Sequence, residues 1–397
     1  MKQVRTSVAR MAVVAGMLGT SVAQTNAPQS SAPSAEKKTW ADAIKVKGDL
    51  RYRYESINDD SKRNANNDTY TRQRDRIRAR LGAEAIVNDD LKVGMELSTG
   101  QADPVSGNQS LGDGFGKKEF RLSLAYMEYN CLGKNPNELR VFAGKMKNPF
   151  LLMVDDLVWD HDLTPEGLAF KSRWGGELAS LLVNGGFLWA QERADKSDLM
   201  LYAGQTALRF GLNPKITLTV GASYYGFQNM EGYDVVDWES KNNSYGNSTV
   251  KGSVHGGVTN KAWATEFTPV VYFAQVDFGI AGQPLSLYAQ ELVNVDADKY
   301  DAGHLYGMTF GKAKDPRSWE IGYSYVELEK DATVGMFTDS DRWGGGTDGK
   351  GHRLSAKYQI FKNLQAGITY FLDEKKISDP GKETDYDRLQ IDLAASF

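Results

Sequence analysis

The chain repeats a regular alternation of apolar and polar residues. Between residues 44 and 54, apolar or small side chains occupy every second position, and Lys45, Arg51 and Arg53 stand among the charged residues between them. A period of two is typical of a β-strand with one dry face and one wet face. The same alternation, and hence a strand, is predicted for 44–54, 76–85, 216–224, 319–325, 354–360, 364–370 and 389–397.

Weaker alternation predicts nine further strands, so that the chain would contain about sixteen. These segments are 91–99, 119–129, 138–146, 167–174, 186–192, 198–210, 266–280, 284–292 and 303–311. Short breaks rich in Asn, Asp and Pro occur at 88–90, 213–214 and 362–363, whereas long Gly-, Asn- and Asp-rich stretches occur at 55–70, 101–118, 228–265 and 330–351. Short and long connections of this kind indicate an all-β protein, a transmembrane antiparallel up-and-down β-barrel.

A soluble β-sandwich or propeller would also alternate, but two features favour the barrel. Arg76, Arg78 and Arg80 place consecutive charges on one polar face, which suits a water-filled interior. Tyr52 and Tyr54 lie together at one strand end, as expected for an aromatic girdle at a membrane interface. Strands in lipid must pair all their backbone groups, so we expect the sheet to close on itself.

The last residue of the chain adds a more specific signal. Phe397 ends an alternating strand and is in phase with Leu393 and Ala395. This ending resembles the C-terminal signal by which outer-membrane barrels are recognised for insertion. We therefore interpret Phe397 as an assembly signal read by the barrel assembly machinery.

The N-terminal segment predicts export from the cytoplasm, and the charge of the chain bears on its partners. Residues 1–23 carry three cations ahead of an apolar run that ends in Ser-Val-Ala, which predicts a signal peptide cleaved after Ala23. Residues 24–39 then form a flexible lead, and 40–397 form one barrel domain. The remaining chain has 44 Lys and Arg against 51 Asp and Glu, so nucleic acid is not expected as a partner. The single cysteine, Cys131, allows no internal disulfide.

Several sequence motifs resemble the putative porin family of Gram-negative outer membranes. They are GDLRYRYE at 48–55, RDRIRARLG at 74–82, GKMKNPF at 144–150 and WDHDLTPEG at 159–167. The resemblance implies an outer-membrane barrel of about sixteen strands that passes small hydrophilic solutes or ions. Such a barrel would contact outer-membrane lipid and lipopolysaccharide, and the sequence leaves both a monomer and a homotrimer open.

A row of arginines is the first candidate site. Arg72, Arg74, Arg76, Arg78 and Arg80 fall on one face of one predicted strand. Arg51 and Arg53 fall on the charged face of the strand before it. Arginine keeps its charge, so these side chains would hold a steady positive field along one wall of a pore. Alternatively, they pair with carboxylates of the lumen and brace the wall. As the pore-lining set we take Arg51, Arg53, Arg74, Arg76, Arg78 and Arg80.

Segment 150–167 is the acidic counterpart of this row. Its apolar residues are interleaved with carboxylates, which suits a loop folded inward with the apolar residues against the wall and the carboxylates facing the channel. Opposed acidic and basic rows would create a transverse field at a constriction. The spacing matches no EF-hand loop, so we expect neither a metal nor a cofactor. The candidate constriction residues are Asp155, Asp156, Asp160, Asp162 and Glu166.

A hydrolase and a surface adhesin are the competing classes, because some outer-membrane barrels are enzymes. The four histidines, His161, His255, His304 and His352, belong to no Gly-x-Ser-x-Gly or His-Glu-x-x-His motif, so no enzyme is expected. An adhesin would use the long loops 228–265 and 330–351. The sequence favours a channel for passive diffusion, with a solute-specific, anion-selective channel as the alternative.

Overall fold

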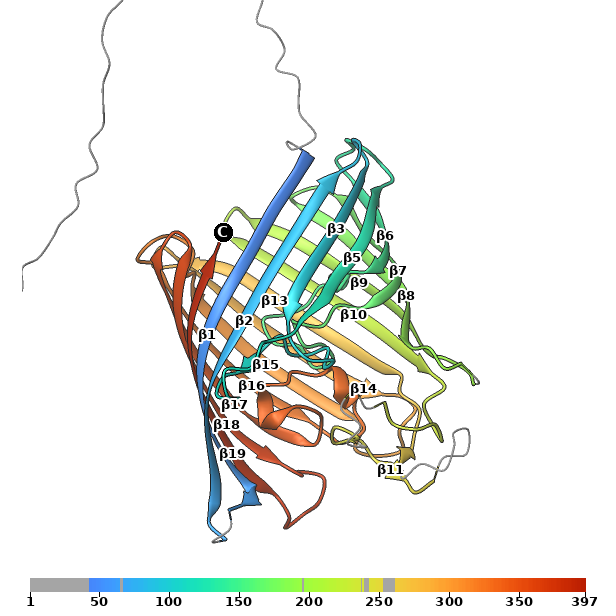
Figure 1. The fold of residues 1–397 in the computed structure, drawn as a ribbon. Coiled ribbons are helices and arrows are strands. Elements are labelled where there is room, and N and C mark those ends of the chain that lie inside the picture. The colour runs from blue at the N-terminus through green and yellow to red at the C-terminus, as the bar shows by residue number, and fades with distance from the viewer. Residues whose placement is uncertain (1–42, 65–66, 195, 237, 239–242, 253–260) are drawn as a thin grey trace, which may run out of the picture. The chain divides into compact units, whose positions relative to one another are not determined.

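The protein is a closed antiparallel β-barrel of 16 strands (Figure 1). The computed structural model describes residues 43–64, 67–194, 196–236, 238, 243–252 and 261–397. All seven clearly alternating segments and all nine weaker ones are strands, so the predicted fold class and strand count are confirmed. The predicted signal peptide 1–23 and flexible lead 24–39 lie outside the described residues. No helix in the described part of the chain is long and apolar enough to cross a membrane.

The wall strands follow one another around the barrel in chain order. They are β1 (Ile44–Arg63), β2 (Thr69–Ile86), β3 (Leu91–Thr99), β5 (Phe120–Asn130), β6 (Glu138–Lys145), β7 (Glu166–Gly175), β8 (Ala179–Gln191), β9 (Leu199–Asn213), β10 (Ile216–Gln228), β13 (Pro269–Ile280), β14 (Gln283–Asn294), β15 (Ala302–Gly311), β16 (Trp319–Leu328), β17 (Gly349–Phe361), β18 (Leu364–Lys375) and β19 (Thr384–Ser396). Short elements within connections are β4 (Gln109–Ser110), β11 (Thr249–Val250), β12 (Ala262–Trp263) and the 3-10 helices η2 (Gly335–Phe337) and η3 (Arg342–Gly344).

The first and last strands close the barrel. β1 pairs with β2 on one side and with β19 on the other, where Asp49 lies opposite Ser396. The amide of Phe397 donates to the carbonyl of Gly48 at 3.0 Å, and the Gly48 amide donates back to the Phe397 carbonyl. A Cβ atom on Gly48 would lie 2.5 Å from the Phe397 ring, so the close approach of the last residue requires glycine there. Closure leaves none of the described wall strands with an unpaired edge exposed to lipid.

Alternation along the strands separates an outer apolar face from the barrel interior. On β1, Leu50 and Tyr52 are exposed on the outside, whereas Glu55 is fully buried inside. Tyrosine hydroxyl groups on the outer face donate to carboxylates of neighbouring strands, as from Tyr52 to Asp75 at 2.6 Å. Such side chains, apolar at one end and polar at the other, suit the boundary between lipid and water.

The connections are short at one end of the barrel and longer at the other. We call these the short-turn end, which includes 214–215 and 362–363, and the long-loop end. The prediction of a loop over 55–70 is wrong, because β1 continues to Arg63 and β2 already begins at Thr69. These strand ends have polar residues on both faces, so the alternation that marks a strand in lipid disappears while the backbone pairing continues.

The connection between β16 and β17 also differs from the surface loop that an adhesin would use over 330–351. It folds back into the barrel, where Val334, Met336 and Phe337 are buried. These apolar residues stand among Gly, Asp and Ser without any periodicity, and they become buried only because another inward segment lies opposite them. Of the other long loop that an adhesin would use, 228–265, residues 237, 239–242 and 253–260 lie outside the described residues.

Candidate functional site

Three connections from the long-loop end meet inside the barrel. They span residues 100–119 between β3 and β5, 146–165 between β6 and β7, and 329–348 between β16 and β17. The Asp160 amide donates to the Phe337 carbonyl at 2.7 Å, and the Ser340 hydroxyl donates to the Val105 carbonyl at 3.0 Å. These hydrogen bonds connect each of the three segments to another. The connected segments divide the lumen of the barrel.

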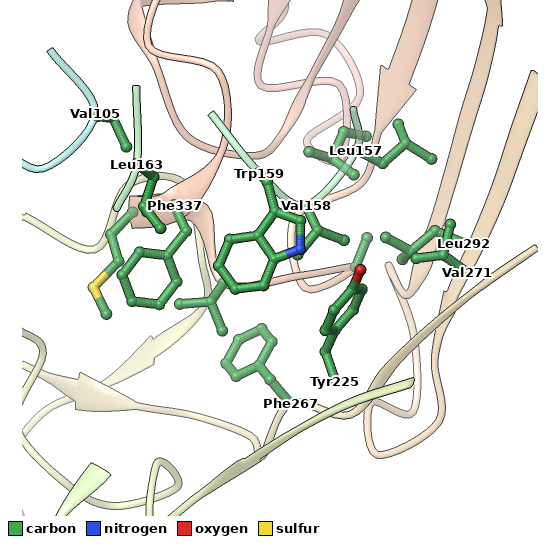
Figure 2. Packing of buried hydrophobic residues seen from close by; sticks show 14 of the residues in the cluster. Val105, Leu157, Val158, Trp159, Leu163, Tyr225, Phe267, Val271, Leu292 and Phe337 are labelled. Carbon is green, nitrogen blue, oxygen red and sulfur yellow. The ribbon is translucent and has the colours of Figure 1, made fainter. Parts of the chain in front are cut away.

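Aromatic and aliphatic side chains fill one side of the lumen (Figure 2). The Trp159 ring lies 6.1 Å from the ring of Phe150, 6.1 Å from that of Phe337 and 5.3 Å from that of Tyr225, centroid to centroid. We call the buried group of Phe150, Trp159, Tyr225, Phe227, Phe267 and Phe337 the aromatic cluster. Inward residues of β13 and β14, Val271 and Leu292, belong to the same buried core.

Polar side chains of the barrel wall fix the 146–165 segment against this side. Gln205 on β9 accepts from the Leu151 amide at 2.7 Å and donates to its carbonyl at 3.1 Å. Gln290 on β14 accepts from the Leu157 amide at 3.0 Å and donates to Asp156 at 2.9 Å. Buried backbone groups need such partners. The segment is therefore held by both apolar packing and specific hydrogen bonds.

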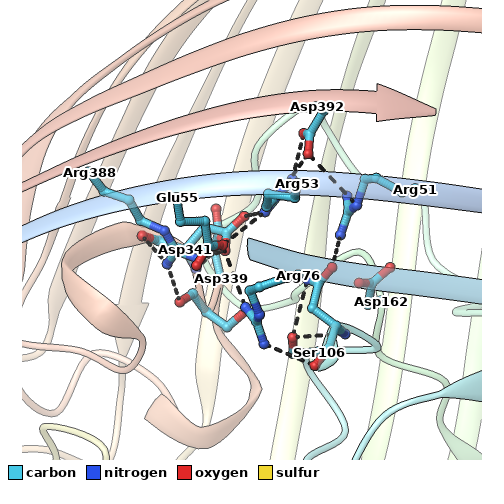
Figure 3. Close-up of polar contacts among 12 residues, drawn as sticks. Arg51, Arg53, Glu55, Arg76, Ser106, Asp162, Asp339, Asp341, Arg388 and Asp392 are labelled. Carbon is cyan, nitrogen blue, oxygen red and sulfur yellow. Dashed lines mark hydrogen bonds and ion pairs between the residues drawn. The ribbon is translucent and has the colours of Figure 1, made fainter. Parts of the chain in front are cut away.

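The opposite side of the lumen is lined by charged residues of β1, β2 and β19 (Figure 3). We call this set the arginine wall: Arg51, Arg53, Arg72, Arg74, Arg76, Arg78, Arg80 and Arg388. Arg53 grips Asp392 through two hydrogen bonds of 2.7 and 2.8 Å and also donates to Asp341 at 3.1 Å. Arg51 donates to the side-chain oxygen of Asn108 at 2.7 Å.

The Glu55 carboxylate binds three residues of the arginine wall. It accepts from Arg388 at 2.6 Å, from Arg74 at 2.6 Å and from Arg76 at 3.5 Å. The Glu55 side chain has no exposed surface and that of Arg388 is 3% exposed. A buried carboxylate is tolerated only with such partners. Neither Glu55 nor Arg388 stood among the predicted site residues, because 333 positions separate them and no local pattern links them.

Of the predicted acidic residues, Asp162 is the one that contacts the arginine wall. It accepts from Arg78 at 3.0 Å and lies 3.7 Å from Arg80. Asp49 on β1 accepts from the same two arginines, at 3.3 Å from Arg78 and 2.6 Å from Arg80. Arg78 and Arg80 of the arginine wall are therefore both in contact with two carboxylates, those of Asp49 and Asp162. Glu166 begins β7 and pairs with Lys145 at 2.8 Å instead.

Asp155 lies away from the arginine wall. It is buried and contacts Arg342, Arg353 and Ser324, the last two through very short contacts. Burial alone would raise the pKa of the Asp155 carboxyl, but Arg353 and Arg342 outweigh burial and lower it. Sequence reasoning did not anticipate either arginine as a partner of Asp155.

Asp160 stands where the 146–165 and 329–348 segments touch. Its carboxylate accepts from the Ser340 amide at 3.0 Å and from the Asp162 amide at 2.7 Å. Burial raises the pKa of Asp160 well above its ordinary value, and the carboxylates of Asp339 and Asp162 raise it further. Burial likewise raises the pKa of Asp156. These two carboxyls therefore take up a proton at higher pH than an ordinary aspartate does.

Three cavities follow one another along the arginine wall. The long-loop cavity measures about 670 Å³, the central cavity about 590 Å³ and the short-turn cavity about 550 Å³. The long-loop and central cavities share Gln101, Asp103 and Ser106 as lining residues. The central and short-turn cavities share Arg80 and Asp162, among others. The three cavities thus form a polar path along the arginine wall. Residues 101–106 narrow this path between the long-loop and central cavities.

The other candidates for a functional role are possible metal ligands, the histidines and Phe397. Within the described residues, no three His, Cys, Asp or Glu side chains are arranged to hold a metal ion. His161 contacts the Val154 carbonyl at 3.0 Å, and His304 pairs with Glu291 on the outer face. His255 lies outside the described residues. The sequence-based interpretation of Phe397 as an assembly signal stays a prediction.

The sequence matches the family model described as "Putative porin" over residues 56–253 and 283–397. Comparison with curated proteins gave no match. Among solved structures, Pseudomonas putida OprB is similar with a TM-score of 0.54 and 11% identity, over 89% of this chain and 94% of OprB. Salmonella typhi OmpF, in complex with daunomycin, is similar with a TM-score of 0.52 and 12% identity, over 89% of this chain and 97% of OmpF. At these identities the likeness shows the barrel fold.

Proposed function

Because the chain belongs to the putative porin family, we propose that it forms a water-filled channel through which small hydrophilic solutes and ions diffuse across the outer membrane of a Gram-negative bacterium. The observation that carries this proposal is the succession of three polar cavities along the arginine wall inside a closed barrel. The aromatic cluster on the other side leaves little room for water. Solutes therefore pass between the arginine wall and the inward segments.

Charge along this path favours anions. The arginine wall contributes eight guanidinium groups, and the carboxylates that contact it are Asp49, Glu55, Asp162, Asp341 and Asp392. Mutual pairing thus neutralises only part of the wall, and the bracing role and the selectivity role coexist. The excess supports the anion-selective alternative within the channel class.

The surroundings of the channel follow from its outer face. Outer-membrane lipid and lipopolysaccharide cover the exposed apolar side chains, and the barrel assembly machinery recognises the terminal strand that ends at Phe397. Replacement of Phe397 by Asp would place a charge beside Gly48 at the closing seam. Loss of the folded barrel from isolated outer membranes is the expected result, and normal amounts of it would contradict the assembly role.

Recording from the purified barrel in a planar bilayer tests the proposal. Stable conductance steps with a reversal potential displaced toward the anion are expected under a salt gradient. The variant carrying Arg76→Gln, Arg78→Gln and Arg80→Gln should shift that potential toward cations, because Asp49 and Asp162 then lose their counter-charges. Arg140→Gln on β6 is the matched control, since Arg140 lines none of the three cavities. A folded but silent barrel would contradict the channel and favour the hydrolase or adhesin.

A further inference from the structure

The long-loop cavity is the most strongly cationic of the three. It is lined by Lys62, Arg72, Arg74, Arg76, Lys118, Lys375 and Arg388, against Asp59, Asp103, Asp113 and Asp341. Three of these carboxylates are closely held by cations: Asp59 by Lys375 at 3.0 Å, Asp113 by Lys118 at 2.7 Å, and Asp341 by Arg388 at 2.8 Å and Arg53 at 3.1 Å. The cavity consequently has a positive surplus that its own carboxylates do not cancel.

Several donors in this cavity retain free hydrogen-bonding capacity. The Arg72 side chain makes no hydrogen bond or ion pair within the described part of the chain. Arg74 contacts Glu55 through its Nε atom alone, so its two terminal nitrogens remain available. The Nε atom of Arg76 is buried without a partner. Arginine presents its donors as a planar fork that fits an oxyanion through two parallel hydrogen bonds.

The spacing of these donors suits a ligand with more than one charged oxygen group. Arg72, Arg74 and Arg76 occupy alternate positions of β2, so successive side chains start about 7 Å apart on the same face. Lys118 enters from the 100–119 segment, where its Nζ atom donates to the Ser110 carbonyl at 2.7 Å and to the Asp113 carboxylate at 2.7 Å, which leaves one of its three donor hydrogens for a ligand. Ser110 lies opposite Arg76 in the β2–β4 pairing, which brings Lys118 to the level of Arg76.

We propose that the long-loop cavity is a binding site for small oxyanions that carry two or more negative charges, such as a dicarboxylate or a phosphate. This inference rests on the proposed channel function and names the substrate class of the same path. An anion bound between Arg72, Arg74 and Lys118 lies next to residues 101–106, where the long-loop cavity meets the central cavity. A singly charged anion engages only one donor group and is held more weakly.

The test measures chloride current through the barrel at pH 7.5 while succinate, inorganic phosphate or acetate is added to the long-loop side. Succinate or phosphate should reduce the current in a saturable way at concentrations at which acetate has little effect. The comparison of succinate with phosphate tells which of the two oxyanions fits better. Arg72→Gln and Lys118→Gln should each weaken the block by about tenfold, the loss expected for one charge-assisted contact.

Lys117→Gln is the matched control, because Lys117 is exposed next to Lys118 and does not line the cavity. The Arg72 side chain has no hydrogen-bond or ion-pair partner among the described residues, so its replacement should leave the barrel intact. A conducting channel without saturable block, or an equal loss of block in Lys117→Gln, would overturn the site while leaving the channel function standing. If the barrel does not conduct, the channel function fails, and calorimetric titration of succinate and phosphate into wild type and Arg72→Gln decides the site by itself.

Discussion

On one side of the barrel, inward positions of β1, β2 and β19 carry arginines and border cavities of about 590 and 670 Å³. On the other side, inward positions of β10, β13 and β14 carry residues such as Tyr225, Val271 and Leu292, which belong to the same buried core as Trp159. Both sides are the same kind of antiparallel sheet. The comparison teaches that the inward residues, and the segments they attract, decide which part of a barrel stays wet.

The two sides also differ in what holds them together. Burial of aromatic rings stabilises the aromatic cluster mainly through the hydrophobic effect, which is non-directional. The arginine wall depends on charge pairing in a partly buried environment, where each unpaired ion is costly. Loss of an aromatic ring should therefore widen the lumen, whereas loss of a charge should change which ions pass.

Trp159→Ala should have the largest effect on the packed side. The substitution removes a ring that is 2% exposed and contacts Phe150, Tyr225 and Phe337, so we expect a loss of about 3–5 kcal/mol in unfolding free energy. The 146–165 segment should loosen, and single-channel conductance should rise and become noisier. Trp189→Ala serves as control, because Trp189 is exposed on the outer face. Unchanged conductance in Trp159→Ala would show that the aromatic cluster does not limit the channel.

On the charged side, Glu55→Gln should lower the stability of the barrel and increase its preference for anions. Arg74, Arg76 and Arg388 would lose their shared carboxylate, and breaking a buried ion pair of this kind costs about 3–5 kcal/mol of unfolding free energy. At the same time the wall becomes more positive, so the reversal potential should move further toward anions. Glu374→Gln, which breaks an exposed pair with Lys350, should change stability by no more than about 1 kcal/mol. A stable Glu55→Gln barrel with wild-type selectivity would contradict both roles.

A change of pH should have a smaller effect, at the contact between the two sides. Because its pKa is raised, the Asp160 carboxyl takes up a proton at higher pH than an ordinary aspartate does, while the lowered pKa of Asp155 keeps that group ionised to lower pH. Loss of negative charge beside Arg51 and Arg78 should then increase anion preference. Asp160→Asn should flatten this response when the reversal potential is measured over a series of decreasing pH values. Asp160 lines a small cavity together with Arg51 and Arg78, so the comparison of this variant with wild type assigns the response to Asp160.

The barrel was predictable from the sequence to the extent that its strands lie in lipid. There, alternation is enforced on every strand, and Leu50 or Leu393 reveals the outer face without reference to any other residue. The inward segments obey no such rule. Phe337 is buried because Trp159 lies opposite it, and Arg388 is paired because Glu55 reaches it from the other end of the chain. Such contacts follow from closure of the barrel, which local pattern does not contain.

The same reasoning explains the mixed outcome for the predicted acidic row. Interleaved apolar residues correctly indicated that the 146–165 segment folds inward, because Leu157 and Trp159 needed burial. The direction of each carboxylate depended on partners that local pattern could not reveal. Asp162 contacts Arg78, whereas Asp155 contacts Arg342 and Arg353 on other elements.

Accessibility of single cysteines tests most directly whether the conducting path follows the arginine wall. In a Cys131→Ser background, Gln101→Cys would place a thiol where the long-loop and central cavities meet, and Val271→Cys would place one in the packed side. A negatively charged methanethiosulfonate reagent should reduce the current of Gln101→Cys and leave that of Val271→Cys unchanged. Block at Val271→Cys, or equal block at both positions, would contradict the account.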